Sequence, residues 1–414
     1  MKIAVVDHYG NTGGSSRVVR SLLPAIIRAD RDISITYFGT KEAIKRENLA
    51  EHFQVSGIKI RYLSGYKARL IKVVNSEPYA KLRGQISGKI NSGILDVLEA
   101  VLKLPVFSMT KEVEKIAADF DLFFFPWPFH MDCPTLDIPM VGIFHDFNYK
   151  YYFSGQCIFS PLSREKIERQ MPVWLGKCTP VVSSKFIKEE LKRFYPFADK
   201  KTRIVHLPRL SEDKIIPADK ASDTILKLGI KSKYILFPTH MVSHKNVGPL
   251  IAATALLISR GYEINLILTG AGTESIRGIA TLIGVQLDDM RNDVYGLGYV
   301  SNHEIDCLIA CASVVVNSSL YEAGNGSGVD AWASGIPVAM SNIPAFVENM
   351  EVLDVRASLF DPRSPADIAD KISLILDNDK NIAEGVEHSK KSMRKITWDN
   401  VGDEYCKIFK SALS

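Results

Sequence analysis

The chain has 414 residues, of which 46% are hydrophobic and 24% are charged, as in ordinary soluble globular proteins. This length fits two domains of about 200 residues better than one. No apolar run approaches the ~20 residues of a membrane-spanning helix, and no secretory signal follows Met1. The six cysteines form no C-x-x-C pair, which is typical of a reducing compartment. We therefore expect a cytoplasmic protein, either free or peripheral on the inner face of the membrane.

The net charge of +4 conceals an uneven distribution. Residues 1–216 carry 33 Lys and Arg against 23 Asp and Glu, whereas residues 217–414 carry 18 against 24. Within the first half, tyrosines and aliphatic residues lie between the basic residues of the range 59–89. No nucleic-acid motif accompanies this range, so we do not expect nucleic-acid binding. It is either a solvated face or a surface for an anionic membrane or an acceptor substrate.

Strands and helices alternate through the first half. Apolar runs predict buried strands at Lys2–Asp7, Ile33–Phe38, Asp121–Phe125, Pro139–Phe144, Thr179–Ser183 and Arg203–His206. Apolar residues at helical spacing predict a helix after the first of these strands and another after the Ser183–Ser184 pair. Residues 89–118 also have a helical pattern, with a break near Pro105. Asp30-Arg31-Asp32 spells a D-x-D metal motif, but it lies between a helix and a strand. We therefore interpret it as a turn.

Two strand ends in the first half carry candidate ligand-binding groups. A glycine turn containing Gly13 and Gly14 joins the first strand to a helix, which is typical of a phosphate site. G-x-G-x-x-G is absent and no acid ends the next strand, so a dinucleotide site is excluded. His145 and Asp146 follow the predicted strand Pro139–Phe144, and parallel sheets bind ligands at the carboxyl ends of their strands. The alternative for His145 is that it only caps the strand.

The second half repeats the alternation after a linker predicted from Pro208 to about Asp223. We expect strands at Tyr234–Phe237, Ile264–Thr269, Val294–Tyr295 and Val314–Val316, and helices at Val247–Arg260, Glu274–Ile283, Asn302–Cys311 and Trp398–Leu413. Ser301 and Glu304 predict a capping box, and Ser364-Pro365 another helix start. Alternation in both halves predicts two doubly wound α/β lobes.

The stretch from Asn317 to Asn342 combines a strand end, a glycine-rich turn with Glu322, and a short helix with Asp330. Small residues allow close backbone approach, and N–H groups at a helix start bind anions. Two carboxylates beside such a turn could hold sugar hydroxyls. Lys245, also between a strand and a helix, could neutralise a diphosphate. Together these features predict a nucleotide-sugar site, while solvated acids on an ordinary turn are the alternative.

The strand, Glu322, seven residues, an acid and the following Gly-x-Pro-Val segment resemble the signature loop of retaining glycosyltransferases of family GT4, which have the GT-B fold. The family usually has Glu-Gly-Phe-Gly at the first acid and Glu at the second, where this chain has Glu-Ala-Gly-Asn and Asp330. It usually has Arg five residues before the Lys, where this chain has His240. The resemblance covers nearly the whole chain and is strongest over residues 234–362.

The resemblance implies an α/β protein of GT-B fold with two Rossmann-like lobes facing a central cleft. Residues 1–209 would bind the acceptor and be rejoined by a C-terminal helix at 397–414, and residues 217–396 would bind the nucleotide sugar. Catalytic roles would fall to Glu322 on the sugar, Lys245 on the diphosphate and His145 from the other lobe, with Asp330 on the ribose. The implied donor-binding residues are Gly13, Gly14, His240, Gly298, Tyr299, Val300, Gly324, Asn325, Gly326, Ser327 and Asp330.

The implied reaction moves a hexose-type sugar, mannose or similar, from a nucleoside diphosphate to a hydroxyl of a glycan or lipid-linked saccharide, with retention. We expect no metal and no cofactor, and a place in bacterial surface polysaccharide assembly such as O-antigen or capsule. One alternative is a nucleotide-sugar epimerase of the same fold. Another is a non-catalytic nucleotide-sugar-binding protein, which the departures at Glu-Ala-Gly-Asn, Asp330 and His240 favour.

Overall fold

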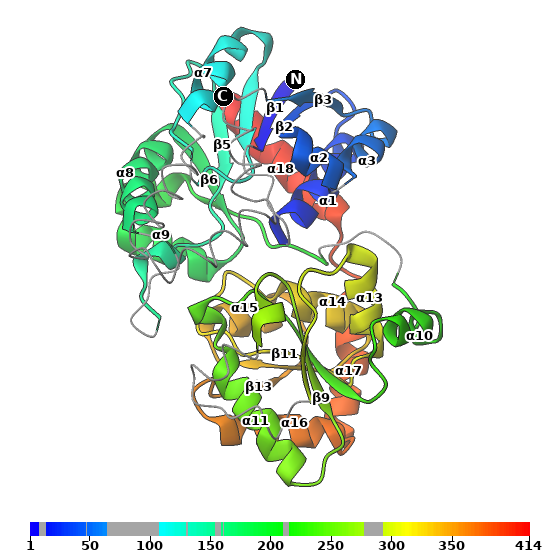
Figure 1. Ribbon diagram of the computed structural model, residues 1–414. Coiled ribbons are helices and arrows are strands. Elements are labelled where there is room, and N and C mark those ends of the chain that lie inside the picture. Colours follow the sequence, from blue (N-terminus) through cyan, green and yellow to red (C-terminus); the bar gives the residue numbers. More distant parts are fainter. Residues whose placement is uncertain are drawn as a thin grey trace, which may run out of the picture. The chain divides into compact units, whose positions relative to one another are not determined.

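The computed structural model describes residues 1–7, 14–46, 48–63, 107–129, 131–153, 159, 161–209, 215–276 and 293–414 (Figure 1). The chain divides into two compact units. The first contains Met1–Tyr152, Cys157–His206 and Trp398–Ser414, and the second contains Phe153–Gln156 and Leu207–Thr397. Among the helices described, none combines the length and apolar character needed to cross a membrane.

The first unit is built on a seven-stranded sheet in the order β3-β2-β1-β4-β5-β6-β7, in which all pairs are parallel. Its strands are β1 (Lys2–Asp7), β2 (Ser34–Gly39), β3 (Lys59–Tyr62), β4 (Leu122–Phe125), β5 (Met140–Ile143), β6 (Cys178–Val182) and β7 (Arg203–Ile204). Its helices are α1 (Gly14–Ala29), α2 (Lys41–Arg46), α3 (Leu49–Val55), α7 (Phe107–Lys115), α8 (Pro161–Lys177), α9 (Lys185–Phe194) and α18 (Trp398–Leu413). Near-continuous apolar strands such as β4 are buried on both faces, as parallel sheets require.

The second unit has a six-stranded sheet in the order β10-β9-β8-β11-β12-β13, also parallel throughout. Its strands are β8 (Tyr234–Pro238), β9 (Asn265–Thr269), β10 (Val294–Gly296), β11 (Val314–Asn317), β12 (Val338–Ser341) and β13 (Ser358–Phe360). Its helices are α10 (Ala218–Lys227), α11 (Val247–Ser259), α13 (Asn302–Cys311), α14 (Gly326–Ser334), α15 (Pro344–Leu353), α16 (Pro365–Leu376) and α17 (Lys380–Ser392). Both units are therefore doubly wound α/β structures, as predicted.

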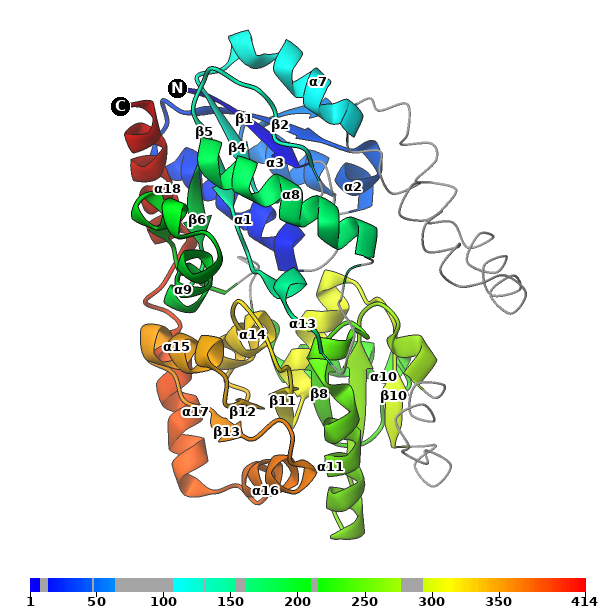
Figure 2. The same ribbon diagram turned by 90° about the vertical axis from the view of Figure 1, so that its left-hand side faces the viewer.

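The last helix, α18, lies beside α1 in both ribbon views (Figures 1 and 2). The two helices approach closely at Gly402, where an added Cβ would lie 2.5 Å from the carbonyl oxygen of Ala25. Arg28 and Asp399 form an ion pair at 2.7 Å across the same contact. The end of the chain thus completes the core of the first unit.

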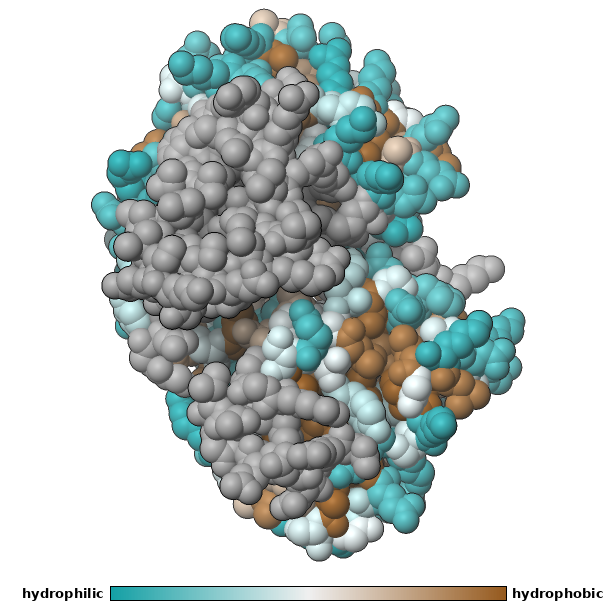
Figure 3. All heavy atoms as spheres, viewed as in Figure 1, coloured by the Kyte–Doolittle hydropathy of each residue, from teal (hydrophilic) through white to brown (hydrophobic). Residues whose placement is uncertain are grey.

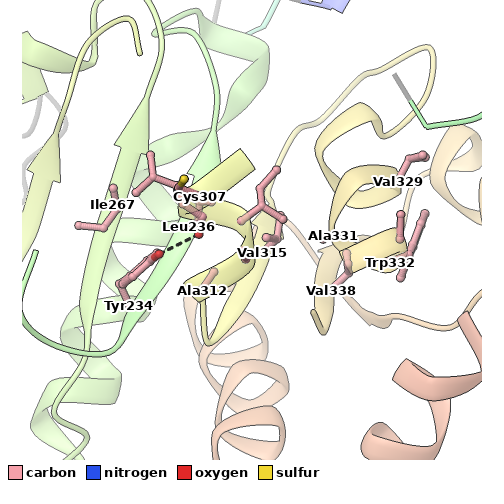
Figure 4. Packing of buried hydrophobic residues seen from close by; sticks show 14 of the residues in the cluster. Tyr234, Leu236, Ile267, Cys307, Ala312, Val315, Val329, Ala331, Trp332 and Val338 are labelled. Carbon is pink, nitrogen blue, oxygen red and sulfur yellow. Dashed lines mark hydrogen bonds between the residues drawn. The ribbon is translucent and has the colours of Figure 1, made fainter. Parts of the chain in front are cut away.

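A buried apolar cluster fixes the strands at the centre of the second sheet (Figure 4). It includes Tyr234 and Leu236 of β8 and Val315 of β11, packed with side chains of α13 and α14. The Tyr234 hydroxyl donates to the carbonyl of Leu308 at 2.8 Å, so its one polar group is satisfied. Close packing of this kind holds the ends of β8 and β11 in a defined position.

The structure confirms most of the expected elements and corrects one. The linker was expected to run to about Asp223, but residues 218–227 form α10, which buries Ala221 and Ile225 on α13. Other α10 side chains, such as Leu226, remain exposed, and apolar residues gather over this part of the second unit in Figure 3. The expected helix at 274–283 begins as a 3-10 turn, Thr273–Ser275, and residues 277–292 lie outside the described part, as do residues 64–106. The Asp30–Asp32 segment is a turn, and Ser301 forms the predicted capping box with Glu304.

Candidate functional site

The candidate site lies where the winding of the second sheet reverses. From β8 the chain continues to β9 and β10 on one side, and β11, β12 and β13 lie on the other. Ligands of open α/β sheets bind outside the carboxyl ends of the strands at such a switch point. Lys245 follows β8 and Glu322 follows β11, so the loops that carry them leave adjacent strands.

Lys245 and Glu322 form an ion pair at this point. The Lys245 ammonium donates to Glu322 Oε1, and Ser319 Oγ donates to the same oxygen at 2.7 Å. The two charged side chains are only 17% and 15% exposed. Burial alone would raise the pKa of Glu322, but Lys245, His244 and the Ser319 hydroxyl together hold this pKa below its usual value. Glu322 is therefore a carboxylate at neutral pH.

Backbone contacts tie the Lys245 loop to its neighbours. Asn246 has a left-handed backbone with φ 53, and its Nδ2 donates to the carbonyls of Ser318 at 3.1 Å and Pro362 at 2.7 Å. Ser318 Oγ in turn donates to the carbonyls of Lys245 and Asn246, each at 3.2 Å. The loops after β8, β11 and β13 are thus held as one framework, which limits the freedom of Lys245.

Two histidines flank the ion pair in an uncharged form. His240 Nδ1 accepts from the Ala271 N–H at 3.3 Å, which leaves the ring proton on Nε2. Burial and then the nearby Lys245 ammonium lower the pKa of His240, and the same two causes lower the pKa of His244 to about 4. At neutral pH the positive charge at this point therefore comes from Lys245.

The predicted donor-binding turn before α14 is held mainly by Asn325. Its Oδ1 accepts from the Gly328 N–H at 3.0 Å and from Asn317 Nδ2 at 3.2 Å, and Ser327 Oγ donates to it at 3.4 Å. A Cβ on Gly328 would lie 2.2 Å from Asn325 Nδ2, and one on Gly324 would lie 3.3 Å from Asn349 Oδ1. Gly326 begins the helix. The side chain of Asn325 therefore caps α14. Gly324 and Gly328 leave room for the neighbouring asparagine side chains, in addition to any role in binding a ligand.

Asp330 is buried within α14. The residue is 1% exposed, and its Oδ1 lies 3.7 Å from Arg209 Nε. Arg209 was not singled out in the sequence, because no pattern links it to an acid 121 positions further along. The structure therefore pairs Asp330 with an arginine, and the role of Asp330 on a ribose stays a prediction.

The turn at Gly298, Tyr299 and Val300 follows β10 at the same edge of the sheet. Gly298 has φ +67, its N–H donates to Thr273 Oγ1 at 2.9 Å, and its carbonyl accepts from the Gly270 N–H at 2.6 Å. The Tyr299 side chain is exposed. Backbone bonds thus set the shape of this turn and leave its side chain available to solvent.

The remaining predicted residues belong to the first unit. His145 follows β5, and its Nε2 donates to the Pro126 carbonyl at 2.9 Å while its ring packs on Trp127 with centroids 4.8 Å apart. Burial lowers the pKa of His145 to about 4, against the opposing effect of the Pro126 bond, so the ring is neutral. Gly14 begins α1, and Gly13 lies outside the described residues. Across the described ranges, no three His, Cys, Asp or Glu side chains are grouped to hold a metal ion.

Most of the second unit matches a known family model. Residues 232–378, which include Lys245, Glu322 and Asp330, match the family model described as Glycosyl transferases group 1. The second unit is therefore similar to this family over those residues. A relative described as an uncharacterized glycosyltransferase of Methanocaldococcus jannaschii is 25% identical over 244 residues. That match covers 57% of this chain and 60% of the relative, so it spans less than two thirds of the relative's length.

The chain also resembles solved structures over both units. Anabaena HepE in complex with UDP and glucose has a TM-score of 0.66 at 15% identity, covering 99% of this chain and 100% of HepE. Sucrose-phosphate synthase of Thermosynechococcus elongatus has a TM-score of 0.67 at 16% identity, covering 99% and 98%. At these identities the likeness establishes the fold, which is GT-B, as the sequence predicted.

Proposed function

We propose that the chain is a retaining glycosyltransferase that moves a hexose-type sugar, mannose or similar, from a nucleoside diphosphate to a hydroxyl of a glycan or lipid-linked saccharide. The observation that carries this proposal is the Lys245–Glu322 ion pair at the switch point of the second sheet, within the segment that matches the family model. The site brings together a cation suited to a diphosphate and a carboxylate suited to sugar hydroxyls. The UDP and glucose bound to HepE are consistent with such a donor.

In the proposed reaction the donor diphosphate replaces Glu322 as the partner of Lys245. Glu322 is then free to accept hydrogen bonds from sugar hydroxyls, and N–H groups at the starts of α11 and α14 add to the anion site. Negative charge grows on the leaving diphosphate in the transition state, so a cation already fixed nearby lowers the barrier. Asp330 would reach the ribose after exchanging its contact with Arg209.

Retention follows, in this proposal, from attack on the same face of the sugar that the diphosphate leaves. The donor phosphate itself takes the acceptor proton, as the family resemblance implies, so no protein nucleophile is needed. His145 supplies a neutral imidazole from the first unit, where its Nε2 hydrogen is already bonded to Pro126. We propose that Lys245 and the helix starts do the work of a metal ion, so that neither metal nor cofactor is required.

We further propose that the acceptor is met at the inner membrane face, during assembly of a surface polysaccharide such as O-antigen or capsule. WaaG, described as a glycosyltransferase involved in lipopolysaccharide biosynthesis, has a TM-score of 0.61 at 14% identity. In the first unit, α9 and the 3-10 helix η3 (Pro196–Lys201) expose four basic side chains, Lys185, Lys192, Arg193 and Lys200. Phe197, on η3, is 58% exposed. Exposed cations and an exposed aromatic residue on one short stretch of the chain favour an anionic membrane surface.

The deciding experiment offers a panel of nucleotide sugars, with and without a cell lipid extract, and measures the released nucleoside diphosphate. We expect release that depends on the extract and survives excess EDTA, and a product whose anomeric coupling constant by NMR matches the donor's configuration. Lys245→Ala should reduce release strongly, whereas Lys231→Ala, an exposed lysine of the same unit, should not.

The other possible results would each contradict a part of this proposal. An inverted linkage would refute retention, and activity restored only by a divalent ion would refute independence from metal. Sugar isomerisation without an acceptor would indicate an epimerase. Tight binding of a nucleotide sugar without turnover on any acceptor would indicate a non-catalytic binding protein.

A further inference from the structure

Phe153 lies among first-unit residues in the sequence but belongs to the second unit in space. Its ring packs on His244, with centroids 5.6 Å apart, and on Tyr321, with centroids 6.2 Å apart. All three residues are buried. His244 directly precedes Lys245 and Tyr321 directly precedes Glu322, so one aromatic side chain contacts the neighbours of both members of the ion pair.

His244 is buried beside three titratable side chains. Lys245, Glu322 and His240 are the titratable groups that act on it, and its own Nδ1 is buried with no hydrogen-bond partner among the residues described. Its carbonyl accepts from the Leu320 N–H at 2.8 Å, which joins its backbone to the Glu322 loop. Removing water from an imidazole disfavours its charged form. The contact with Phe153 therefore helps to keep His244 neutral.

The charge on His244 matters because of what it would do to the ion pair. A protonated imidazole there would repel Lys245 and compete with it for Glu322. Water entering beside the pair would also weaken its attraction, since charges interact more weakly in a medium of higher dielectric constant. Both effects would loosen the position of the Lys245 ammonium.

We propose that Phe153 is a positioning residue of the donor site: by covering His244 and Tyr321 it excludes water from the neighbours of Lys245 and Glu322 and holds their ion pair in one geometry. The inference rests on the proposed function, because it assigns Phe153 to the same site. The residue touches no reacting atom and acts through the two loops that it covers.

The test compares wild type with Phe153→Ala and Phe153→Leu, using NMR titration of His244, affinity for nucleoside diphosphates by calorimetry, and turnover against pH. In the wild type we expect His244 to titrate near its buried value of about 4. In Phe153→Ala it should titrate closer to its ordinary 6.5, diphosphate affinity should become pH-dependent around that value, and turnover should fall as the pH drops through it. Phe153→Leu, which keeps an apolar cover, should lie close to wild type.

Leu226→Ala, which removes an exposed apolar side chain of the second unit, is the matched control and should change none of the three readouts. An unchanged His244 titration in Phe153→Ala would overturn the proposal. So would a raised titration with unchanged diphosphate affinity and an unchanged pH profile, because Phe153 would then be only a packing residue. If Phe153→Ala does not fold, Phe153→Gln, which replaces the ring with a polar side chain, is compared with wild type by the same criteria. The His244 titration needs no turnover, so failure of the proposed activity is distinguishable from failure of this inference.

Discussion

Replacing Glu322 with glutamine should separate diphosphate binding from catalysis. In the structure Glu322 accepts the hydrogen bond of the Lys245 ammonium, so a donor diphosphate must compete with a carboxylate for the same cation. Glutamine has nearly the same shape and can still accept from Ser319, but it carries no charge. We therefore expect Glu322→Gln to bind nucleoside diphosphates more tightly than wild type while losing turnover.

The burial of the Lys245–Glu322 ion pair determines how much the diphosphate affinity should change. With side chains 17% and 15% exposed, the bond is neither a surface ion pair nor a fully interior one. A hydrogen bond between charged groups contributes about 1.5–3 kcal/mol, and removing this competition should raise diphosphate affinity roughly 10- to 100-fold. Turnover should fall by about 10²- to 10³-fold, the usual effect of losing one fixed polar group at a reacting centre.

Stability should change in the opposite direction from affinity. Lys245 loses its carboxylate in the variant, and for a pair of this burial we expect a cost of about 2 kcal/mol, or roughly 4–8 °C in the melting temperature of a unit of this size. Glu322 has a folded-state pKa below its ordinary 4.5, so its contribution is present above that value and is lost as the pH falls through the folded pKa. Acid destabilisation below pH ~4.5 should therefore be shallower in Glu322→Gln.

Calorimetric titration with a panel of nucleoside diphosphates, and thermal unfolding with and without them, measure these quantities. Glu351→Gln, an exposed glutamate of α15, is the control for removal of a negative charge from the same unit. The double variant Lys245→Ala, Glu322→Gln should lose the gain in affinity, because the gain depends on the freed ammonium. Equal or weaker diphosphate binding by Glu322→Gln would refute the competition on which this reasoning depends.

Two further predictions concern the first unit. Binding to anionic liposomes should fall steeply as salt rises, because polybasic attraction is worth about 1 kcal/mol per residue and is screened; equal binding to neutral liposomes, or none, would contradict membrane contact. Gly402→Ala should lower the melting temperature, since its Cβ would lie 2.5 Å from the Ala25 carbonyl. Gly176→Ala in α8 is the control, because nothing lies within 4 Å of an added Cβ, and a melting temperature for Gly402→Ala at or above wild type would show that α1 and α18 can move apart.

The elements of both sheets were predictable because their patterns are local. Apolar runs mark β1, β4 and β8, and a serine and a glutamate three residues apart mark the start of α13. That Lys245 and Glu322 lie at one edge of the sheet was also predictable, since carboxyl ends of parallel strands share that edge, whereas the adjacency of β8 and β11 was not. The α10 helix was missed because only Ala221 and Ile225 bury its short apolar face, beside turn-forming residues.

The contacts that decide the chemistry were not predictable, because they join residues distant in the sequence. Nothing local indicates that Lys245 bonds Glu322 directly, that Arg209 lies by Asp330, or that Phe153 packs on His244. Each contact depends on side-chain conformations that the finished packing selects.

The position of α18 bears on how the chain is made. Apart from residues 153–156, the second unit is one continuous stretch, Leu207–Thr397. The first unit, in contrast, is completed by a helix that begins at Trp398, after the whole second unit. At ordinary rates of synthesis, the roughly 190 residues between His206 and Trp398 take about 10–40 s to emerge from the ribosome. During this time the face of α1 that receives Gly402 and Cys406 is uncovered, so the half that is translated first completes its core last. Loss of α18 would therefore damage the amino-terminal half of the protein.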